Sequence, residues 1–224
     1  PSVWVTLSRL HVESGDFIEA ERAALKARSL APGWKTAAIA LARALRADSR
    51  SGIAALHLGE AVIAHPDDRE LAELFGLCLL ESGKVTEARA EFRKLAERDS
   101  YDPLTFFNLG RVAEAAGDAV GAAECYRTAI ARAPRVAAAR EALAVLSGRH
   151  GRFAEARASL EELIRDRPES PFGFRGLGDL LVDVDAAEAL RFYEEARQRS
   201  PDIPSAGLYF LSGNKCLIEK EFSE

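Results

Sequence analysis

The sequence is poor in the residues that build metal sites, disulfide frameworks and many active sites. Its 224 residues include no methionine, three cysteines and four histidines. Cys78, Cys125 and Cys216 are an odd number with no close pair, so the sequence indicates neither a disulfide framework nor a zinc site. The histidines share no metal-ligand spacing. We therefore predict no metal and no cofactor, and we interpret the cysteines as small apolar side chains.

The chain also lacks a long hydrophobic run and an excess of positive charge. No apolar stretch is long enough to cross a bilayer, so we predict no direct membrane insertion. Lys plus Arg number 30 against 35 for Asp plus Glu, a net charge of -5. Phosphate binding needs a concentrated basic face, so we expect no nucleic acid partner. A hydrophobic fraction of 48% and a charged fraction of 29% indicate an ordered, water-soluble protein.

Local signatures of catalysis are missing as well. The glycines at 173, 176 and 178 resemble a phosphate-binding loop, but no strand pattern precedes them and they fall inside a helical pattern. Carboxylate pairs such as Glu161 and Glu162 are typical of a solvated helix face. We therefore predict no catalytic residue and no enzyme activity within this chain.

A 34-residue internal repeat is the strongest positive signal. Small residues recur at this step, and a large apolar residue precedes each of them. The small column is Ser8, Ala42, Gly76, Gly110, Ala144 and Gly178. The large column is Leu7, Leu41, Phe75, Leu109, Leu143 and Leu177. One inserted residue would destroy this register, so the repeat predicts stacked, equivalent structural units.

A second series of columns predicts a second helix in each unit. Its small residues are Ala20, Ala54, Ala88, Ala122, Ala156 and Ala189. The terminating residues are Pro32, Pro66, Ser100, Pro134, Pro168 and Pro201. Ala189 comes one residue early, which predicts a one-residue deletion in the turn at 183–185. Ser49 stands where the other turns carry glycine.

This pattern resembles the tetratricopeptide repeat family. Its signature is met by Trp4, Leu7, Gly15, Ala20, Ala27 and Pro32, and again by Phe106, Leu109, Gly110, Gly117, Ala122, Tyr126, Ala129 and Pro134. The resemblance implies an all-α, right-handed superhelical solenoid of antiparallel helix hairpins. Six repeats would span 1–205, with bounds at 1–34, 35–68, 69–102, 103–136, 137–170 and 171–205.

The last residues, 206–224, allow two interpretations. Tyr209, Gly213 and Asn214 fall at the family's offsets, which favours a partial seventh repeat or capping helix over about 207–219. The competing interpretation is a β-hairpin around 212–214. We favour the helix because the exposed seam of the sixth repeat needs an element of the same shape to cover it.

The resemblance implies that first helices line a concave groove that binds a partner peptide or helix. Carried over by offset, the lining is Val5, Arg9, Ile39, Arg43, Arg46, Glu70, Glu73, Leu77, Leu80, Leu104, Phe107, Asn108, Arg111, Glu141, Val145, Phe172, Arg175 and Asp179. Within it, Leu77, Leu80, Leu104 and Phe107 form an apolar strip, which we expect to anchor the partner while the arginines take its acidic flank. The alternative is that these side chains pack against their own neighbours.

We predict a non-catalytic protein-binding scaffold, with self-association possible through the terminal repeats. The alternatives are a recruiting arm of a larger bacterial enzyme, of glycosyltransferase or sulfotransferase type, and a part of an envelope or secretion assembly. The chain begins at the first position of a repeat and has no methionine, so we expect a piece of a longer protein. We expect a cytoplasmic location; a periplasmic one stays open because a signal peptide cannot be judged without the native start.

Overall fold

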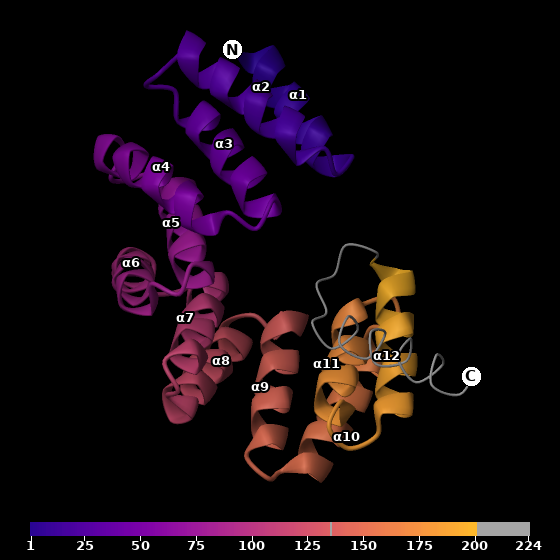
Figure 1. The fold of residues 1–224 in the computed structure, drawn as a ribbon. Helices are drawn as coiled ribbons and strands as arrows, with labels where there is room; N and C mark the ends of the chain where they lie inside the picture. The colour runs from indigo at the N-terminus through magenta and orange to yellow at the C-terminus, as the bar shows by residue number, and fades with distance from the viewer. Residues whose placement is uncertain (135, 201–224) are drawn as a thin grey trace, which may run out of the picture. The chain divides into compact units, whose positions relative to one another are not determined.

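The computed structural model describes residues 1–134 and 136–200, and these form two compact units, the first of residues 1–118 and the second beginning at Ala119. Each unit is treated by itself (Figure 1). The first unit contains α1 (Ser2–Glu13), α2 (Phe17–Leu30), α3 (Lys35–Ala47), α4 (Ser51–Ala64), α5 (Arg69–Glu81), α6 (Val85–Arg98) and α7 (Pro103–Ala115). The second contains α8 (Ala119–Arg132), α9 (Ala137–Arg149), α10 (Phe153–Asp166), α11 (Pro171–Leu181) and α12 (Ala186–Arg199).

The helix boundaries repeat because the start and stop residues repeat. From α3 to α11, each odd-numbered helix starts 34 residues after the previous one. Asp68 and Asp102 cap two of these starts, since their carboxylates accept hydrogen bonds from the backbone N–H groups of Leu71 and Thr105. At the other end, the even-numbered helices stop two residues before the terminating proline or serine. The predicted all-α architecture is confirmed over the described residues.

The small columns lie where helices approach each other. Ser8, Ala42, Gly76, Gly110, Ala144 and Gly178 are all buried. So are Ala20, Ala54, Ala88, Ala122, Ala156 and Ala189, none of which is more than 1% exposed. Small side chains let the two helices of a hairpin and the next first helix pack closely, while large residues fill the space between them.

In the first unit, one continuous core runs through the stacked hairpins. It extends from Ala24 on α2 to Val112 on α7, and Leu45, Leu58 and Phe92 are among its fully buried members. The ring of Phe92 lies directly on Gly76, where an added Cβ would come within 2.9 Å of it. A larger residue at 76 would therefore push α5 and α6 apart.

In the second unit, the three glycines of α11 are contact points for large side chains. An added Cβ would come within 2.7 Å of Ile164 at Gly173, 2.5 Å of Leu160 at Gly176 and 2.6 Å of Tyr193 at Gly178. The glycines that resemble a phosphate-binding loop are thus explained by helix packing against α10 and α12.

The turns inside the hairpins repeat one backbone conformation. Gly15, Gly83, Gly117 and Gly151 have φ between +76° and +84°, and Ser49 occupies the equivalent position at φ +58°. The sixth hairpin differs: α11 stops at Leu181, α12 starts at Ala186, and no residue of this turn has a positive φ. The predicted one-residue deletion is confirmed, and it removes the left-handed turn residue.

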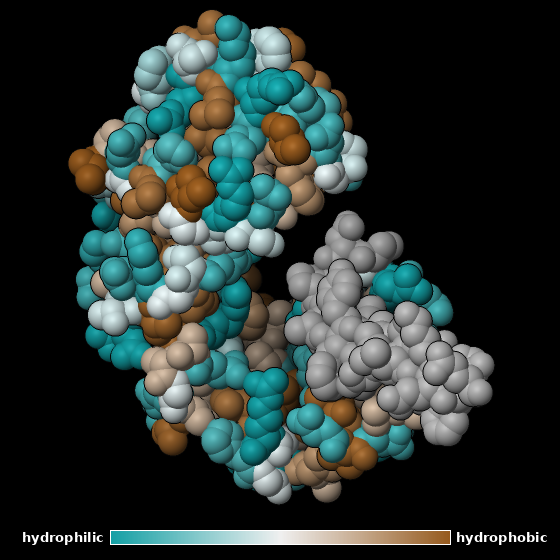
Figure 2. Space-filling view, in the orientation of Figure 1, coloured by the Kyte–Doolittle hydropathy of each residue, from teal (hydrophilic) through white to brown (hydrophobic). Residues whose placement is uncertain are grey.

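The surface shows no segregation of hydrophilic from hydrophobic residues on the coloured part of the face drawn in Figure 2. None of the helices in the described ranges combines the length and the apolarity that a membrane span requires.

The predicted partial seventh repeat at 206–224 lies outside the described residues.

Replacing Ser49 with glycine should stabilise the protein. A residue with a Cβ costs about 1 kcal/mol in the left-handed region, so Ser49→Gly should raise the free energy of unfolding by about that amount. The measurement is urea denaturation followed by circular dichroism.

Gly83→Ala is the matched control for Ser49→Gly. An added Cβ at Gly83 meets nothing within 4 Å, so this change tests the backbone conformation alone and should lower stability by about 1 kcal/mol. Equal stability of wild type and Ser49→Gly would contradict the assigned turn conformation.

Candidate functional site

The structure divides the predicted groove residues between the two units. In the first unit they lie on α1, α3, α5 and α7, and in the second on α9 and α11. The two sets differ in character: the first borders an open pocket, whereas the second is largely taken up by a buried ion pair.

A pocket of about 130 Å³ lies in the first unit between α1 and α3. It is lined by Val5, Ser8, Arg9, Val12, Thr36, Ile39, Ala40, Arg43 and Glu70. Five of these were predicted as groove residues, so the structure brings together the arginine end of the predicted lining. Ile39 differs from the expectation, because it is buried and forms part of the core under the pocket.

The charged side chains around this pocket are held loosely. Arg9 Nη1 lies 3.0 Å from Glu13 Oε1, and Arg43 Nη2 lies 2.8 Å from Glu70 Oε1. All four side chains are more than half exposed, so each pair contributes little stability. A carboxylate from a partner can therefore replace Glu13 or Glu70 at small cost.

Arg46, by contrast, is committed to a structural contact. Its guanidinium bonds both carboxylate oxygens of Glu81 at 2.7–2.9 Å, and Ser51 Oγ donates to the same carboxylate at 2.8 Å. The hydrogen bond to Glu81 raises the pKa of Arg46. Burial alone would raise the pKa of Glu81, but the hydrogen bonds from Arg46 and Ser51 outweigh it and hold that pKa below its usual value. We assign Arg46 to the packing of α3 on α5.

The predicted apolar strip is only partly available. Leu77 and Leu80 are half-buried and pack against the core of the first unit. Leu104 is 52% exposed, whereas Phe107 is half-buried. The alternative of packing against neighbours thus holds for the two α5 leucines.

Glu73 and Asn108, two predicted polar groove residues near the strip, each accept a hydrogen bond from an arginine of the same helix. Arg69 Nε donates to Glu73 at 2.6 Å on α5. Arg111 Nη1 donates to Asn108 Oδ1 at 3.3 Å on α7.

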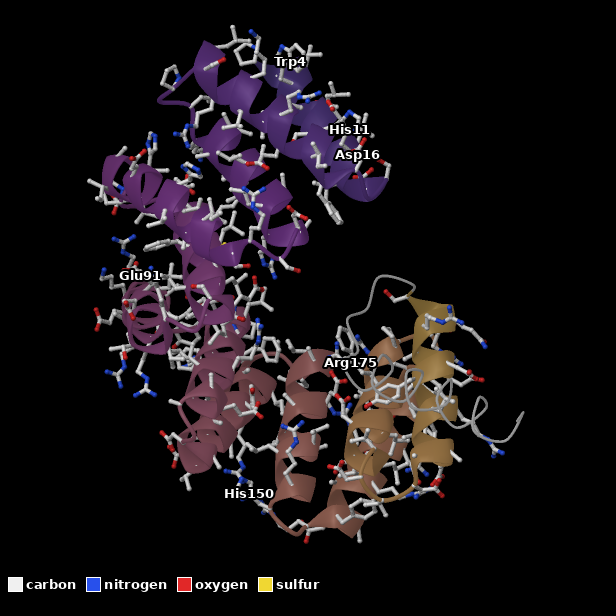
Figure 3. The ribbon with its side chains drawn as sticks, in the orientation of Figure 1. Trp4, His11, Asp16, Glu91, His150 and Arg175 are labelled. Carbon is white, nitrogen blue, oxygen red and sulfur yellow. The ribbon has the colours of Figure 1, made fainter. Side chains whose placement is uncertain are left out.

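In the second unit, Glu141 and Arg175 form a buried bidentate pair. Glu141 on α9 is only 3% exposed, so the expectation that it lines an open surface is wrong. Arg175 Nε and Nη2 donate to its two oxygens at 2.8 and 2.5 Å. The Glu141 side chain lies over Gly176, where an added Cβ would come within 2.9 Å of it. Figure 3 labels Arg175 on α11.

The network continues around Arg175. Its guanidinium carbon lies 5.4 Å from the centre of the Phe172 ring. One turn further along α11, Asp179 accepts a hydrogen bond of 2.7 Å from the hydroxyl of Tyr193 on α12. Polar contacts therefore join α9, α11 and α12. Tyr193 was missed as a polar residue because the repeat pattern identifies it only as a buried aromatic.

Burial dominates the electrostatics of this network. It raises the pKa of Glu141 to about 7, although the hydrogen bonds and charge of Arg175 act in the opposite direction. Burial also raises the pKa of Asp179, against the hydrogen bond from Tyr193. For Arg175, burial lowers the pKa, but the Glu141 hydrogen bonds outweigh it and the net pKa is raised. The positive charge of Arg175 thus acts on two carboxylates, Glu141 and Asp179, whose ionisation burial disfavours.

The structure adds pocket residues that the sequence analysis left out. Val12, Thr36 and Ala40 line the pocket between α1 and α3. Val12 was detectable, because it lies 34 residues before Arg46 and 68 before Leu80, in a column already assigned to the groove. Within the described residues, no group of three or more His, Cys, Asp or Glu side chains is placed to hold a metal ion.

A family model for the tetratricopeptide repeat matches residues 39–103, 107–171 and 148–204. The chain belongs to the tetratricopeptide repeat family. Tetratricopeptide repeat proteins act in general in protein–protein interaction, and their fold is generally non-catalytic. A relative, cellulose synthase operon protein C of Pseudomonas fluorescens (strain SBW25), is 29% identical over 175 residues. The match covers 75% of this chain, and the chain spans only 14% of that relative.

Solved structures share the fold. A tetratricopeptide repeat protein from Parabacteroides merdae ATCC 43184 is 20% identical, with a TM-score of 0.69, and the match covers 98% of this chain and 87% of that one. YrrB, described as a tetratricopeptide repeat protein with an unusual peptide-binding site, is 17% identical with a TM-score of 0.50; the match covers 80% of this chain and 93% of that one. At these identities the likeness concerns the fold alone.

Glu141 should make stability fall with rising pH. Its pKa is raised from 4.5 to about 7 in the folded state, so between these values the folded protein holds a proton that the unfolded chain has lost. Its contribution to the free energy of unfolding therefore falls as pH rises from about 4.5 through 7. The loss is up to about 3 kcal/mol. Urea denaturation at pH 5 and pH 8 measures it.

Two variants separate the pair's charge from its packing. Glu141→Gln keeps the shape and removes the titration, so it should be less pH-dependent than wild type. Arg175→Leu leaves the carboxylate buried without its cation and should cost about 3 kcal/mol or more at pH 8. Identical pH dependence in wild type and Glu141→Gln would contradict the assignment.

Proposed function

We propose that this chain is a non-catalytic scaffold that binds an extended or helical segment of a partner protein through the pocket between α1 and α3. The observation that carries the proposal is the combination of apolar lining with exposed arginines in the same pocket. Val5, Val12 and Ala40 offer apolar surface, and Arg9 and Arg43 stand beside it.

This chemistry favours a partner segment with an aliphatic anchor next to acidic residues. When the aliphatic anchor enters the pocket, its apolar surface is removed from water, and this burial supplies affinity. Acidic flanking residues replace the intramolecular partners of Arg9 and Arg43, which supplies orientation and on-rate. Leu104, the most exposed member of the predicted strip, offers a second apolar contact in the same unit.

The remaining predicted groove residues take different roles in this proposal. Arg46, Glu141 and Arg175 shape the array through their internal ion pairs. Phe172 lies against Arg175. Self-association through the terminal repeats stays a prediction.

A second candidate is that the chain is the recruiting arm of a longer bacterial protein in an envelope or polysaccharide-synthesis assembly. The match to cellulose synthase operon protein C favours it, because this chain corresponds to a small part of that relative. Binding of a partner segment is common to both candidates, so the pocket is the feature to test first.

Peptide selection from a random library provides the test. Enriched peptides should carry an aliphatic residue flanked by Asp or Glu, and their affinity should fall as salt rises. Fluorescence anisotropy with one such peptide should show at least about tenfold weaker binding to Val12→Glu, which places a charge on the pocket floor. Arg43→Glu should weaken binding mainly at low salt.

Lys94→Glu is the matched charge control, because Lys94 is an exposed residue of α6 outside the pocket. It should bind the peptide like wild type. Equal affinity of wild type and Val12→Glu, with both correctly folded by circular dichroism, would exclude the pocket.

A further inference from the structure

The outer helix of the second repeat, α4, is apolar on a side that faces solvent. Glu60 is the only Asp, Glu, Lys or Arg among its 14 residues. Ile53, Leu56 and Ile63 are 40%, 67% and 83% exposed. A helix with apolar residues all round is normally buried, so the exposed side of α4 is unusual for the surface of a folded chain.

At the positions of Ile53, Leu56 and Ile63, α4 differs from the other second helices. Equivalent positions in the other five repeats never carry a large aliphatic residue. Ile53 corresponds to Glu19, Glu87, Gly121, Glu155 and Glu188; Leu56 to Arg22, Ala90, Glu124, Ala158 and Arg191; Ile63 to Ser29, Glu97, Ala131, Arg165 and Gln198. The repeat fold therefore does not require these side chains. Brown side chains are visible over α4 in Figure 2.

A cavity of about 100 Å³ beside this face is lined by two side chains of opposite charge. Arg28 of α2 and Glu60 of α4 both line it, together with Trp34, His57 and His65. Arg28 Nη1 lies 2.9 Å from His57 Nδ1. An arginine can only donate, so this ring nitrogen accepts the bond. Burial and the Arg28 charge both lower the pKa of His57, which agrees with a neutral ring.

Arg28 and Glu60 differ from most charged residues around them. Over the ranges 1–134 and 136–200, neither forms an ion pair. Their neighbours Glu21 and Arg50, in contrast, bond each other across α2 and α4 at 2.5 Å. Arg28 and Glu60 thus place opposite charges, neither of them in an ion pair over these ranges, beside an apolar helix face.

We propose that the outer face of α4, defined by Ile53, Leu56 and Ile63, binds a second copy of this chain. In an antiparallel α4–α4 pair centred near residue 58, Ile53 of each copy lies beside Ile63 of the other. The same two-fold arrangement brings Glu60 of each copy toward His57 and Arg28 of the other, so the contact between opposite charges is made twice. The face is chemically complementary to itself.

The expected dimer is weak. A stable interface buries about 800 Å² per partner, and one 14-residue helix with its flanking cavity offers less than that. Association should therefore depend on concentration and reverse on dilution. This surface lies outside the pocket between α1 and α3, so the dimer and the proposed peptide binding can fail independently.

Sedimentation velocity of the full 224-residue chain tests the dimer. From about 1 µM to about 1 mM, the range of weak association, the mean mass should rise toward that of two chains. Leu56→Glu and Ile63→Glu should keep the monomer mass throughout. Ala90→Glu, at the position of α6 equivalent to Leu56, should associate like wild type. A wild-type chain that stays monomeric at the highest concentration, or a Leu56→Glu variant that still dimerises, overturns the proposal.

Charge exchange tests the two-fold arrangement. Arg28→Glu and Glu60→Arg alone should each weaken the dimer by about tenfold or more, because each puts like charges together twice. The double variant should recover the wild-type dissociation constant to within about threefold, because it restores opposite charges across the interface. A double variant no tighter than the single ones overturns the proposal, and circular dichroism of each variant confirms that it is folded.

Discussion

Close contact between helix backbones at one recurring small residue is the constraint on which the rest of this structure depends. Where Gly76 and Gly178 stand, the neighbouring helix supplies a large side chain to the same place: Phe92 at Gly76 and Tyr193 at Gly178. A small residue on one helix facing a large residue on the next fixes the distance between the two helices. Helix faces are positioned by this packing, and so are the pocket and the ion pairs.

The repeat itself was readable from the sequence because packing leaves a periodic trace. Over residues 1–134 and 136–200, the twelve helices, their order, the turn positions and the deletion in the sixth hairpin all follow from columns of small residues, prolines and glycines. Buried side chains at equivalent positions face equivalent neighbours, so selection for packing repeats at the same step. The helix favoured for 206–224 lies outside the described residues and stays a prediction.

The candidate site was predictable only in part. The position of a residue within the repeat predicts which face of its helix the side chain lies on, but not which other side chain it contacts. Arg9 and Arg43, which share one offset, both line the pocket between α1 and α3. The same offsets placed Glu141 and Arg175 in one column 34 residues apart, which puts them side by side in the stacked array. Their opposite charges then made a buried pair instead of an open surface. Opposite charges 34 residues apart therefore predict an ion pair between neighbouring repeats. Assigning groove residues one at a time from the family pattern does not use this information.

The fixed 34-residue step has a consequence for how such a chain can change in length. Removing or duplicating one whole hairpin joins two helices that already possess matching seams, so the junction resembles the boundaries on either side. Partial insertions inside a helix lack this property. Recombination between repeats can thus alter the reach of the array while each remaining hairpin keeps its neighbours, and a distinctive unit such as the one containing α4 can be moved or copied as a cassette.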